Sequence, residues 1–466
     1  MPAALHSPLH RSITGSGAAI RRRRDPMERA PTSPTSTEQP FGADELFFSA
    51  TDRKGIITSG NSVFVRVSAY GRDELIGRAH NIVRHPDMPR AVFQVLWDYL
   101  EAGRPIAAYV KNLAKNGNHY WVVATVAPTD DGGYLSVRMK PTCGILAVVE
   151  PLYAKVRAHE RTLEAAGTPR KQVIASGIEL LVELIGQAGF ASYDDLMRHF
   201  LPAELAHRDA ELGHVVAGGL TGVGTDCLAL KRALDRVFAQ LDRYAELERG
   251  LDGKAEHLAV MAESARLSAL NATISASRLG NDGRVLAAIA MLMRREAGET
   301  EEAIQAAAHA VEPTRDATGD VGFDVCLAKI QAEMALYFLD ELARGGGDDD
   351  AQQNVGLLLT AAAQSAATLD AKLATARRLI EELAQAVDAV TQKLQMLDAL
   401  RVGGDVEAAH LTDAERFRVL FAQIRSEVDG AAADLRHLAG LADHAAAASS
   451  GRRLDRLADR TLRHAA

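Results

Sequence analysis

The sequence predicts an α+β domain in its first third, followed by an all-α region that forms a coiled coil or helical bundle. Two observations lead to this expectation. Of the 23 Phe, Tyr and Trp residues, 12 lie between Phe41 and Tyr134, including both tryptophans. The remaining chain is rich in Ala, Leu, Glu, Arg and Gln. Aromatic and β-branched segments separated by turns favour a sheet, whereas periodic Ala/Leu segments favour helices.

The aromatic part divides into five expected strands and several short helices. "ELFFSATD" and "GIITSG" predict two strands joined by a tight turn at Arg53–Gly55. "NSVFVRVSAY" and "RDELIG" predict short helices, and "PRAVFQVLWDYLEAG" predicts a longer helix between Pro89 and Gly103. Strands "IAAYVKNLAK", "HYWVVATVAP" and "GGYLSVRMK" follow, with a hairpin turn at Asn116–Asn118. We therefore expect a five-stranded antiparallel α+β sensor-type domain over residues 41–142.

Regularly spaced apolar residues predict long helices after this domain. One a/d seam with alternating spacing of four and three consists of Leu369, Leu373, Ala376, Ile380, Leu383, Val387, Val390, Leu394 and Leu397. A shorter seam consists of Leu230, Leu234, Val237, Leu241 and Tyr244, with Leu251 and Leu258 in the same register after a charged interruption at Glu248. Such seams must be buried against partner helices, so we expect an antiparallel bundle, a dimeric coiled coil, or both.

The helical region divides into three expected segments. These are a connector (143–225), a helical hairpin (226–343) and a C-terminal coiled coil (344–466). Glycine clusters at Gly345 and Gly403 are expected to interrupt the helices. A weak similarity links "ALNATISASRL" with "ALRVGGDVEAAHL", and "VLAAIAMLMRRE" with "FRVLFAQIRSE". This similarity suggests a second copy of the hairpin in the last segment, and chance similarity is the alternative.

Composition narrows the classes of function. A formal net charge of -8 over 466 residues gives no overall field that favours nucleic acid. The isolated cysteines Cys143, Cys227 and Cys326 form neither a disulfide framework nor a metal-binding pair, which fits a reducing, cytoplasmic setting. No stretch approaches the ~20 continuous apolar residues of a membrane helix. We therefore expect no membrane span.

The N-terminal stretch has a different character from the rest. Residues 1–40 contain "RRRR" at Arg21–Arg24 and are rich in Pro, Ser and Thr, which predicts a disordered basic arm. Met27 offers a second plausible start, so that either Met1 or Met27 begins the natural chain.

The motif "HNIVRHPDMP", followed by "VKNLAKNGNHYWVV", gives the first half a specific resemblance. With these motifs, residues 41–142 resemble the PAS domain of the bacterial aerotaxis receptor family over nearly their whole length. The resemblance implies FAD bound non-covalently inside the domain, and a protein that reports redox, oxygen or energy state.

The resemblance also implies which residues bind the flavin. The matching positions are Asn61, Arg84, His85, Asp87, Trp97 and Asn112. The amide of Asn112 is suited to hydrogen-bond the polar edge of the flavin ring, and Trp97 offers a face for stacking. Arg84 is suited to pair with a pyrophosphate or a carboxylate, and His85, expected to titrate near neutrality, to follow a charge change on the flavin.

Structural roles are the alternatives for the same motif. Asp87 is suited to cap the helix that begins near Pro89, with Arg84 as its ion partner. His80 and His119 are expected to be hydrogen-bonded structural histidines rather than metal ligands, because no companions stand at metal-binding spacing.

The sequence also bears on cofactors other than flavin. Haem is the alternative, because several histidines lie near the expected pocket helices. Light-driven flavin–cysteine chemistry would require a pocket cysteine, yet Cys143 lies past the last strand. Ile106 stands where family members often have Trp, which would loosen the flavin site.

The stretch "LAVMAESARLSALNATISASRLGNDGRVLAAIAMLMRREA" resembles the signalling hairpin of methyl-accepting chemotaxis proteins. This second resemblance implies a homodimer that contacts the chemotaxis kinase and its coupling protein. Two departures weaken that coupling. Residues Ala262–Arg266 replace the family's kinase-contacting positions, and Leu292 replaces an acidic residue.

No enzyme signature stands in the sequence, so a non-enzymatic signalling protein is expected. We predict a cytoplasmic sensor of redox, oxygen or energy state that binds FAD in a PAS domain and transmits through a chemotaxis-receptor-like helical region. The alternatives are a haem or small-ligand PAS sensor, and a PAS and coiled-coil scaffold that senses nothing.

Overall fold

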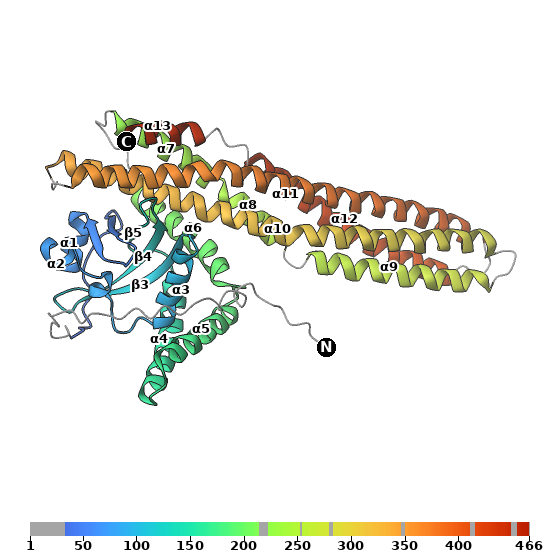
Figure 1. The fold of residues 1–466 in the computed structure, drawn as a ribbon. Coiled ribbons are helices and arrows are strands. Elements are labelled where there is room, and N and C mark those ends of the chain that lie inside the picture. Colours follow the sequence, from blue (N-terminus) through green and yellow to red (C-terminus); the bar gives the residue numbers. More distant parts are fainter. Residues whose placement is uncertain are drawn as a thin grey trace.

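The computed structural model describes residues 33–213, 222–251, 254–278, 283–345, 350–410, 415–448 and 454–465. Figure 1 shows a small sheet domain beside one end of a long helical rod. Most of the basic arm expected over residues 1–40, and the alternative start at Met27, lie outside the described residues.

A single antiparallel sheet forms the centre of the small domain. Its strands are β1 (Phe47–Thr51), β2 (Ile57–Gly60), β3 (Ile106–Leu113), β4 (His119–Pro128) and β5 (Tyr134–Met139). Their order across the sheet is β2-β1-β5-β4-β3, and each neighbouring pair is antiparallel. The five-stranded antiparallel sheet expected from the sequence is therefore confirmed. We call residues 41–142 the sheet domain.

Short helices cover one face of this sheet between β2 and β3. They are α1 (Ser62–Ser68), α2 (Arg72–Leu75), the 3₁₀ helix η2 (His80–Val83) and α3 (Arg90–Glu101). Glycines provide the left-handed backbone in both expected turns, at Gly55 (φ 73°) and Gly117 (φ 91°). The turns fix the strand register, so that the polar positions of β1, β3 and β5 face the short helices.

Helices from later in the chain cover the other face of the sheet. The Phe200 ring of α6 (Tyr193–Leu212) lies 4.7 Å from the Tyr109 ring of β3. The Phe338 ring of α10 (Arg284–Ala343) lies 5.3 Å from the Phe48 ring of β1, edge to face. The sheet is therefore buried on both faces.

The expected connector packs on the sheet domain as helices. Helix α4 (Leu146–Ala165) is followed by α5 (Arg170–Gln187), and both contact α3. The buried Glu160 of α4 accepts hydrogen bonds from the backbone N–H groups of Arg90 (2.9 Å) and Ala91 (2.8 Å). Because the first N–H groups of a helix lack partners within the helix, Glu160 caps α3 from another helix.

The rod consists of the remaining helices. They are α7 (Val223–Phe238), α8 (Leu241–Leu251), α9 (Lys254–Ser277), α10, α11 (Ala351–Ala408), α12 (Glu415–Ala448) and α13 (Leu454–Ala465). Hairpin α9–α10 packs on hairpin α11–α12 to give a four-helix bundle (Figure 1). Every member of both predicted apolar seams is buried except Leu251, whose side chain lies outside the described part of the chain, and this confirms a bundle with coiled-coil spacing.

One expected interruption is wrong. Helix α11 continues through Gly403 and Gly404 to Ala408. The reason is packing, because a Cβ atom added to Gly404 would lie 2.5 Å from the Phe421 ring of α12. The glycine therefore admits a large aromatic ring between two helices rather than ending one of them.

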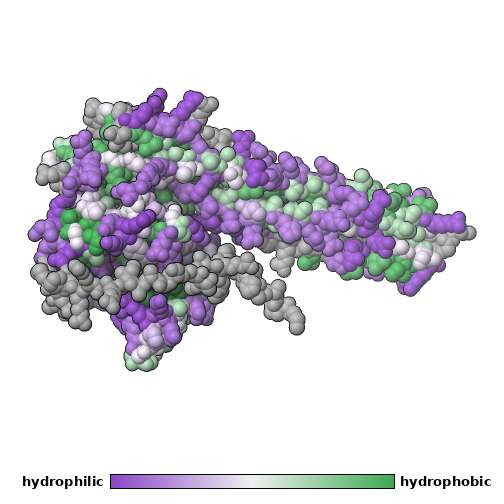
Figure 2. Space-filling model, viewed as in Figure 1, coloured by the Kyte–Doolittle hydropathy of each residue, from purple (hydrophilic) through white to green (hydrophobic). Residues whose placement is uncertain are grey.

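The surface of the rod is mainly hydrophilic, with apolar patches toward the end away from the sheet domain (Figure 2). Val260, Leu267 and Ile274 of α9 are 65%, 46% and 45% exposed, and their spacing of seven places them on one helix face. Among the described helices, none is long and apolar enough to cross a membrane.

Candidate functional site: a cavity with a buried arginine

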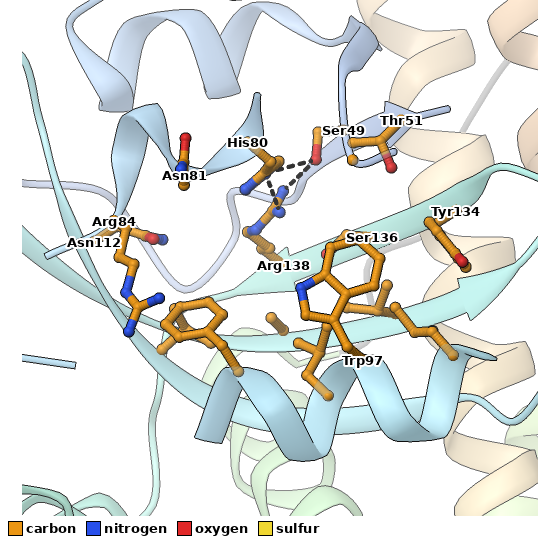
Figure 3. A pocket seen from close by; sticks show the side chains of 17 residues that line it. Ser49, Thr51, His80, Asn81, Arg84, Trp97, Asn112, Tyr134, Ser136 and Arg138 are labelled. Carbon is orange, nitrogen blue, oxygen red and sulfur yellow. Dashed lines mark hydrogen bonds between the residues drawn. The ribbon is translucent and has the colours of Figure 1, made fainter. Parts of the chain in front are cut away.

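A cavity lies in the sheet domain between the sheet and helices η2 and α3 (Figure 3). It encloses about 720 Å³, part of which is open to solvent. Its walls are formed by Ser49, Thr51, Gly55, His80, Asn81, Arg84, Phe93, Leu96, Trp97, Leu100, Val110, Asn112, Ala124, Val126, Tyr134, Ser136 and Arg138. Ligand sites typically combine apolar walls with a few polar groups in this way.

A buried arginine on β5 faces this cavity. Arg138 is 5% exposed, and its guanidinium donates to the Ser49 hydroxyl (2.9 Å) and to Nε2 of His80 (2.7 Å). The three side chains come from β5, β1 and η2, and Figure 3 shows them converging. The Arg138 guanidinium therefore links the sheet to the short helix η2.

His80 is neutral in this arrangement. Burial, and then the charge of Arg138, hold its pKa well below the usual value of 6.5. Because a guanidinium only donates hydrogen bonds, Nε2 of His80 must accept from Arg138, and the ring proton then sits on Nδ1. The expectation that His80 is a hydrogen-bonded histidine is confirmed.

No carboxylate balances the charge of Arg138 within the part of the chain that the structure describes. Its hydrogen-bond partners are neutral, and the cavity walls contain neither Asp nor Glu. Burial lowers its pKa to about 10, so it still carries a proton at neutral pH. The hydroxyl of Ser136, two residues away on the same strand, is also buried, and among the described residues it has no hydrogen-bond partner.

Three of the six predicted flavin-binding residues line the cavity. The Asn112 amide makes no hydrogen bond to the described residues, although the side chain is only 3% exposed. Trp97 lies edge-on to Tyr134 at 5.6 Å, and Gly55 leaves room for its indole ring. The Arg84 guanidinium lies 4.0 Å from the centre of the Phe93 ring. Their roles toward a cofactor remain predictions.

The other three predicted residues lie outside the cavity wall. Asn61 caps α1, and its amide joins the backbone of β1 to Glu341 of α10. His85 is buried, and its Nδ1 accepts from the backbone N–H of Asp87. Asp87 is half exposed and pairs with Arg161 of α4 at 2.8 Å. These contacts position the walls, and binding to a cofactor by these residues is still untested.

Two specific expectations about this motif are wrong. Asp87 neither caps α3 nor pairs with Arg84: Glu160 caps α3, and Arg84 donates to the carbonyls of Met88 and Pro89. His85 does not titrate near neutrality, because burial, and then the charge of Lys111, lower its pKa to about 4. Both errors arise because the deciding partners lie far away in sequence.

Sequence reasoning missed the polar residues that strands contribute to the cavity. Ser49, Ser136 and Arg138 stand in strands whose other residues are mostly apolar. A charged residue inside such a strand was the available signal. Such a residue indicates a solvent-facing side rather than a cavity, because alternating polar residues in a strand ordinarily face water.

The remaining chemistry-bearing groups lie elsewhere. Cys143 approaches the Tyr109 hydroxyl on the sheet face away from the cavity. None of the three cysteines lines the cavity. Among the described residues, no group of three or more His, Cys, Asp or Glu side chains stands close enough to hold a metal ion.

Sequence comparison gives this domain its family. The profile of the PAS fold matches residues 57–138. These residues form a PAS domain. Over 128 residues the chain is 44% identical to the aerotaxis receptor of Escherichia coli (strain K12), a match that covers 27% of this chain and 25% of that receptor. The resemblance of the PAS domain to the aerotaxis receptor family is therefore confirmed, and the match leaves three quarters of that receptor uncovered.

Solved structures add little to this assignment. A PAS domain from Colwellia psychrerythraea is 18% identical, with a TM-score of 0.18, and the match covers 20% of this chain and 85% of that one. The light state of the Aureochrome1 LOV domain is 20% identical, with a TM-score of 0.20, and covers 25% and 90%. Scores this low add nothing to what the strand order of the PAS domain already shows.

The buried His85 predicts an acid sensitivity of the PAS domain. Between pH 6.5 and about 4 the unfolded chain binds a proton at His85 that the folded chain does not, so the free energy of unfolding falls as pH falls through this window. The loss from this residue approaches about 3 kcal/mol at the acid end. Tryptophan fluorescence during urea unfolding reports on this domain alone, because both tryptophans lie in it.

His85→Asn should therefore give a shallower pH dependence than the wild type. The asparagine oxygen is suited to replace Nδ1 as the acceptor for Asp87, and His80 will retain part of the acid sensitivity. The exposed His437→Asn is the control. Equal slopes for His85→Asn and the wild type would show that His85 does not cause the effect.

Proposed function

We propose that this protein is a signal-transduction protein that senses redox or oxygen state through FAD bound in the cavity of its PAS domain. The observation that carries the proposal is the cavity itself. Among the described residues, it combines a buried cation without an anionic partner (Arg138), a hydroxyl without a hydrogen-bond partner (Ser136) and an amide without one (Asn112). The likeness to the aerotaxis receptor adds support for a sensing role.

The residues present fit a flavin. A flavin ring offers carbonyl and nitrogen atoms that would satisfy Asn112, Ser136 and Arg138. The indole of Trp97 and the ring of Phe93 provide apolar surface for a flat heteroaromatic group. When bound, FAD supplies a ring that takes up electrons and, with them, negative charge or protons. Arg84 lies at the end of the cavity away from Tyr134 (Figure 3), where it would meet a charged part of the ligand.

A haem has weaker support from the same geometry. His80 is the histidine among the cavity-lining residues, and its Nε2 lies 2.7 Å from Arg138 and 3.1 Å from the Ser49 hydroxyl. The lone pair that an iron would require is therefore already engaged by hydrogen-bond donors.

Helix α10 supplies the contact through which the PAS domain would signal. Glu341 accepts from the backbone N–H of Ser62 (3.0 Å) and from the amide of Asn61 (3.3 Å). The Asn61 amide oxygen in turn accepts from the backbone N–H of Phe48, whose ring packs on Phe338. The strand that carries the cavity residue Ser49 is thus held against α10 by a packed pair and a hydrogen-bonded carboxylate.

The far end of the rod would be the output. The exposed stripe of Val260, Leu267 and Ile274 lies on α9, within the hairpin that resembles chemotaxis receptors. Exposed apolar patches commonly mark contacts with partner proteins. The chemotaxis kinase and its coupling protein are the partners that we propose for this end, with affinity reduced by the departures at Ala262–Arg266.

The absorption spectrum of the purified protein tests the cofactor. Bands near ~370 and ~450 nm that are released on denaturation identify flavin. Trp97→Ala and Asn112→Ala should each weaken flavin binding by about tenfold or more, since each removes a contact with the ring. Trp121→Ala is the matched control outside the cavity. A Soret band would replace flavin by haem, and a colourless protein that takes up no added FAD would contradict the proposed sensing role.

Hydrogen exchange tests the coupling. Protection of residues 333–343 should differ between air-oxidised and dithionite-reduced protein, because the Asn61 amide joins Glu341 of α10 to the backbone of β1. Glu341→Ala should abolish the difference. The neighbouring Asp340→Asn, whose side chain pairs only with Arg344 among the described residues, should retain it. Identical protection in both states of the wild type would contradict transmission through α10.

A further inference from the structure

Among the described residues, no carboxylate balances the charge of Arg138. The other two buried arginines of these residues do pair with carboxylates: Arg208 with Glu333 and Arg401 with Asp398, each at 2.7 Å. Arg138 is as deeply buried as Arg208, yet its partners are the neutral Ser49 and His80. A buried cation without an anion is costly, because its two hydrogen bonds and the Phe47 and Phe64 rings, 5.9 and 5.6 Å away, replace only part of its hydration.

The polar residues around Arg138 hold its guanidinium in place and leave one hydroxyl available for a hydrogen bond to a ligand. His80 and Ser49 hold one side of the guanidinium and also contact each other at 3.1 Å. On the same strand, the Ser136 hydroxyl lies in the cavity wall without a partner. Among the described residues, Arg138 thus lacks an anionic partner and the Ser136 hydroxyl lacks any hydrogen-bond partner, and both side chains stand on one strand of the cavity.

We infer that Arg138 and Ser136 form the binding edge for a negatively charged or electron-rich part of the cavity ligand, and that Arg138 makes that ligand easier to reduce. This inference rests on the proposed flavin and adds residues that the family motif does not contain. A fixed positive charge in a site of low dielectric stabilises the more negative redox state of whatever group it contacts. Arg138 therefore positions the ligand and sets its redox balance.

Arg138→Met tests the inference in the full-length chain. Methionine is similar in length and neutral, and Ser49 and His80 can keep their mutual hydrogen bond. With FAD bound, the ratio of reduced to oxidised FAD at a fixed solution potential should fall by about tenfold or more relative to the wild type. Arg138→Lys should restore most of the ratio. The exposed Arg53→Met, outside the cavity, should leave it unchanged.

A thermal measurement on FAD-free protein separates this inference from the proposed function. Without a ligand, Arg138→Met should raise the midpoint of thermal unfolding by a few degrees, because a buried charge without an anion is removed. If the wild type binds no FAD but the variant is still more stable, the flavin proposal fails and an anionic ligand of another class remains inferred. If the FAD-free variant is equally or less stable, Arg138 is a structural residue and the inference is overturned.

The helical bundle carries a second, independent inference. Its buried positions repeat along the chain. The buried α9 residues Ala265, Ala269, Ala272 and Ala276 have buried α11 counterparts 132 positions later, namely Leu397, Arg401, Gly404 and Ala408. The buried α10 residues Leu286, Ala290, Met293, Ala297 and Ile304 have buried α12 counterparts 131 positions later, namely Phe417, Phe421, Ile424, Val428 and Leu435.

The two hairpins also compensate for each other in volume. In the α11–α12 hairpin, Gly404 packs against the Phe421 ring. The counterparts in the α9–α10 hairpin are Ala272 and Ala290, two small residues. A large ring beside a glycine in one hairpin thus replaces two alanines in the other, as expected for copies that have diverged while keeping a filled core.

We propose that the helical half is a duplicated hairpin whose two copies close into one bundle within a single chain. A second chain would then be unnecessary to bury the apolar seams. Any homodimer of the kind that the family resemblance implies would be joined through another surface.

Cysteine cross-linking tests this second proposal. The Ser264 hydroxyl of α9 donates to the Glu427 carboxylate of α12, so these positions lie side by side in one chain. A full-length Cys143→Ser chain that carries Ser264→Cys and Glu427→Cys should react with a short bismaleimide to give a product of single-chain mass in which both new thiols are consumed. The chain with Ser264→Cys alone is the control. A product of two-chain mass, or no link at all, would overturn the proposal.

Discussion

The structure depends on one continuous helix that belongs to both halves. Helix α10 has 60 residues, which at 1.5 Å per residue gives a length of roughly 90 Å. Its C-terminal part packs on β1 through Phe338 and bonds Asn61 and Ser62 through Glu341, while its N-terminal part forms the core of the four-helix bundle. A rigid element shared in this way leaves few independent motions. A displacement of β1 against α10 must either be absorbed at their contact or be carried along the helix.

The sequence was sufficient to predict most helices and strands, but not the contacts that these elements make with distant parts of the chain. Strand alternation, turn glycines and heptad seams depend on neighbouring residues, and these patterns predicted all five strands, the helices α1, α2 and α3 and the buried positions of α11, but not η2. The prediction that Gly403 and Gly404 end a helix was wrong because it also relied on neighbouring residues alone. Glycine is a poor helix former locally, but Phe421 of another helix decides the outcome. That long-range contact leaves no local signature.

The residues predicted to bind the cofactor also fall into two groups, those placed by local patterns and those engaged by distant residues. Arg84, Trp97 and Asn112 line the cavity and come from the motifs that the sequence made conspicuous. Asn61 and Asp87 stand in equally conspicuous motifs, but their side chains engage Glu341 and Arg161, which are distant in sequence. Polar residues of the sheet were overlooked because a polar residue in a strand predicts a solvent-facing side. Here α6 and α10 cover the apolar face, so the polar face lines a cavity instead.

The position of the charge also favours a particular direction of transmission. Arg138 stands on β5 and bonds Ser49 on the adjacent strand β1 and His80 on η2, so the proposed change of charge in the cavity would act first on the sheet and on η2 rather than on α3. Ser49 is the neighbour of Phe48, and successive strand residues face opposite sides. The same two residues of β1 therefore contact the cavity cation on one face and Phe338 of α10 on the other. Only the thickness of one strand separates the site from the helix that leads to the far end of the rod.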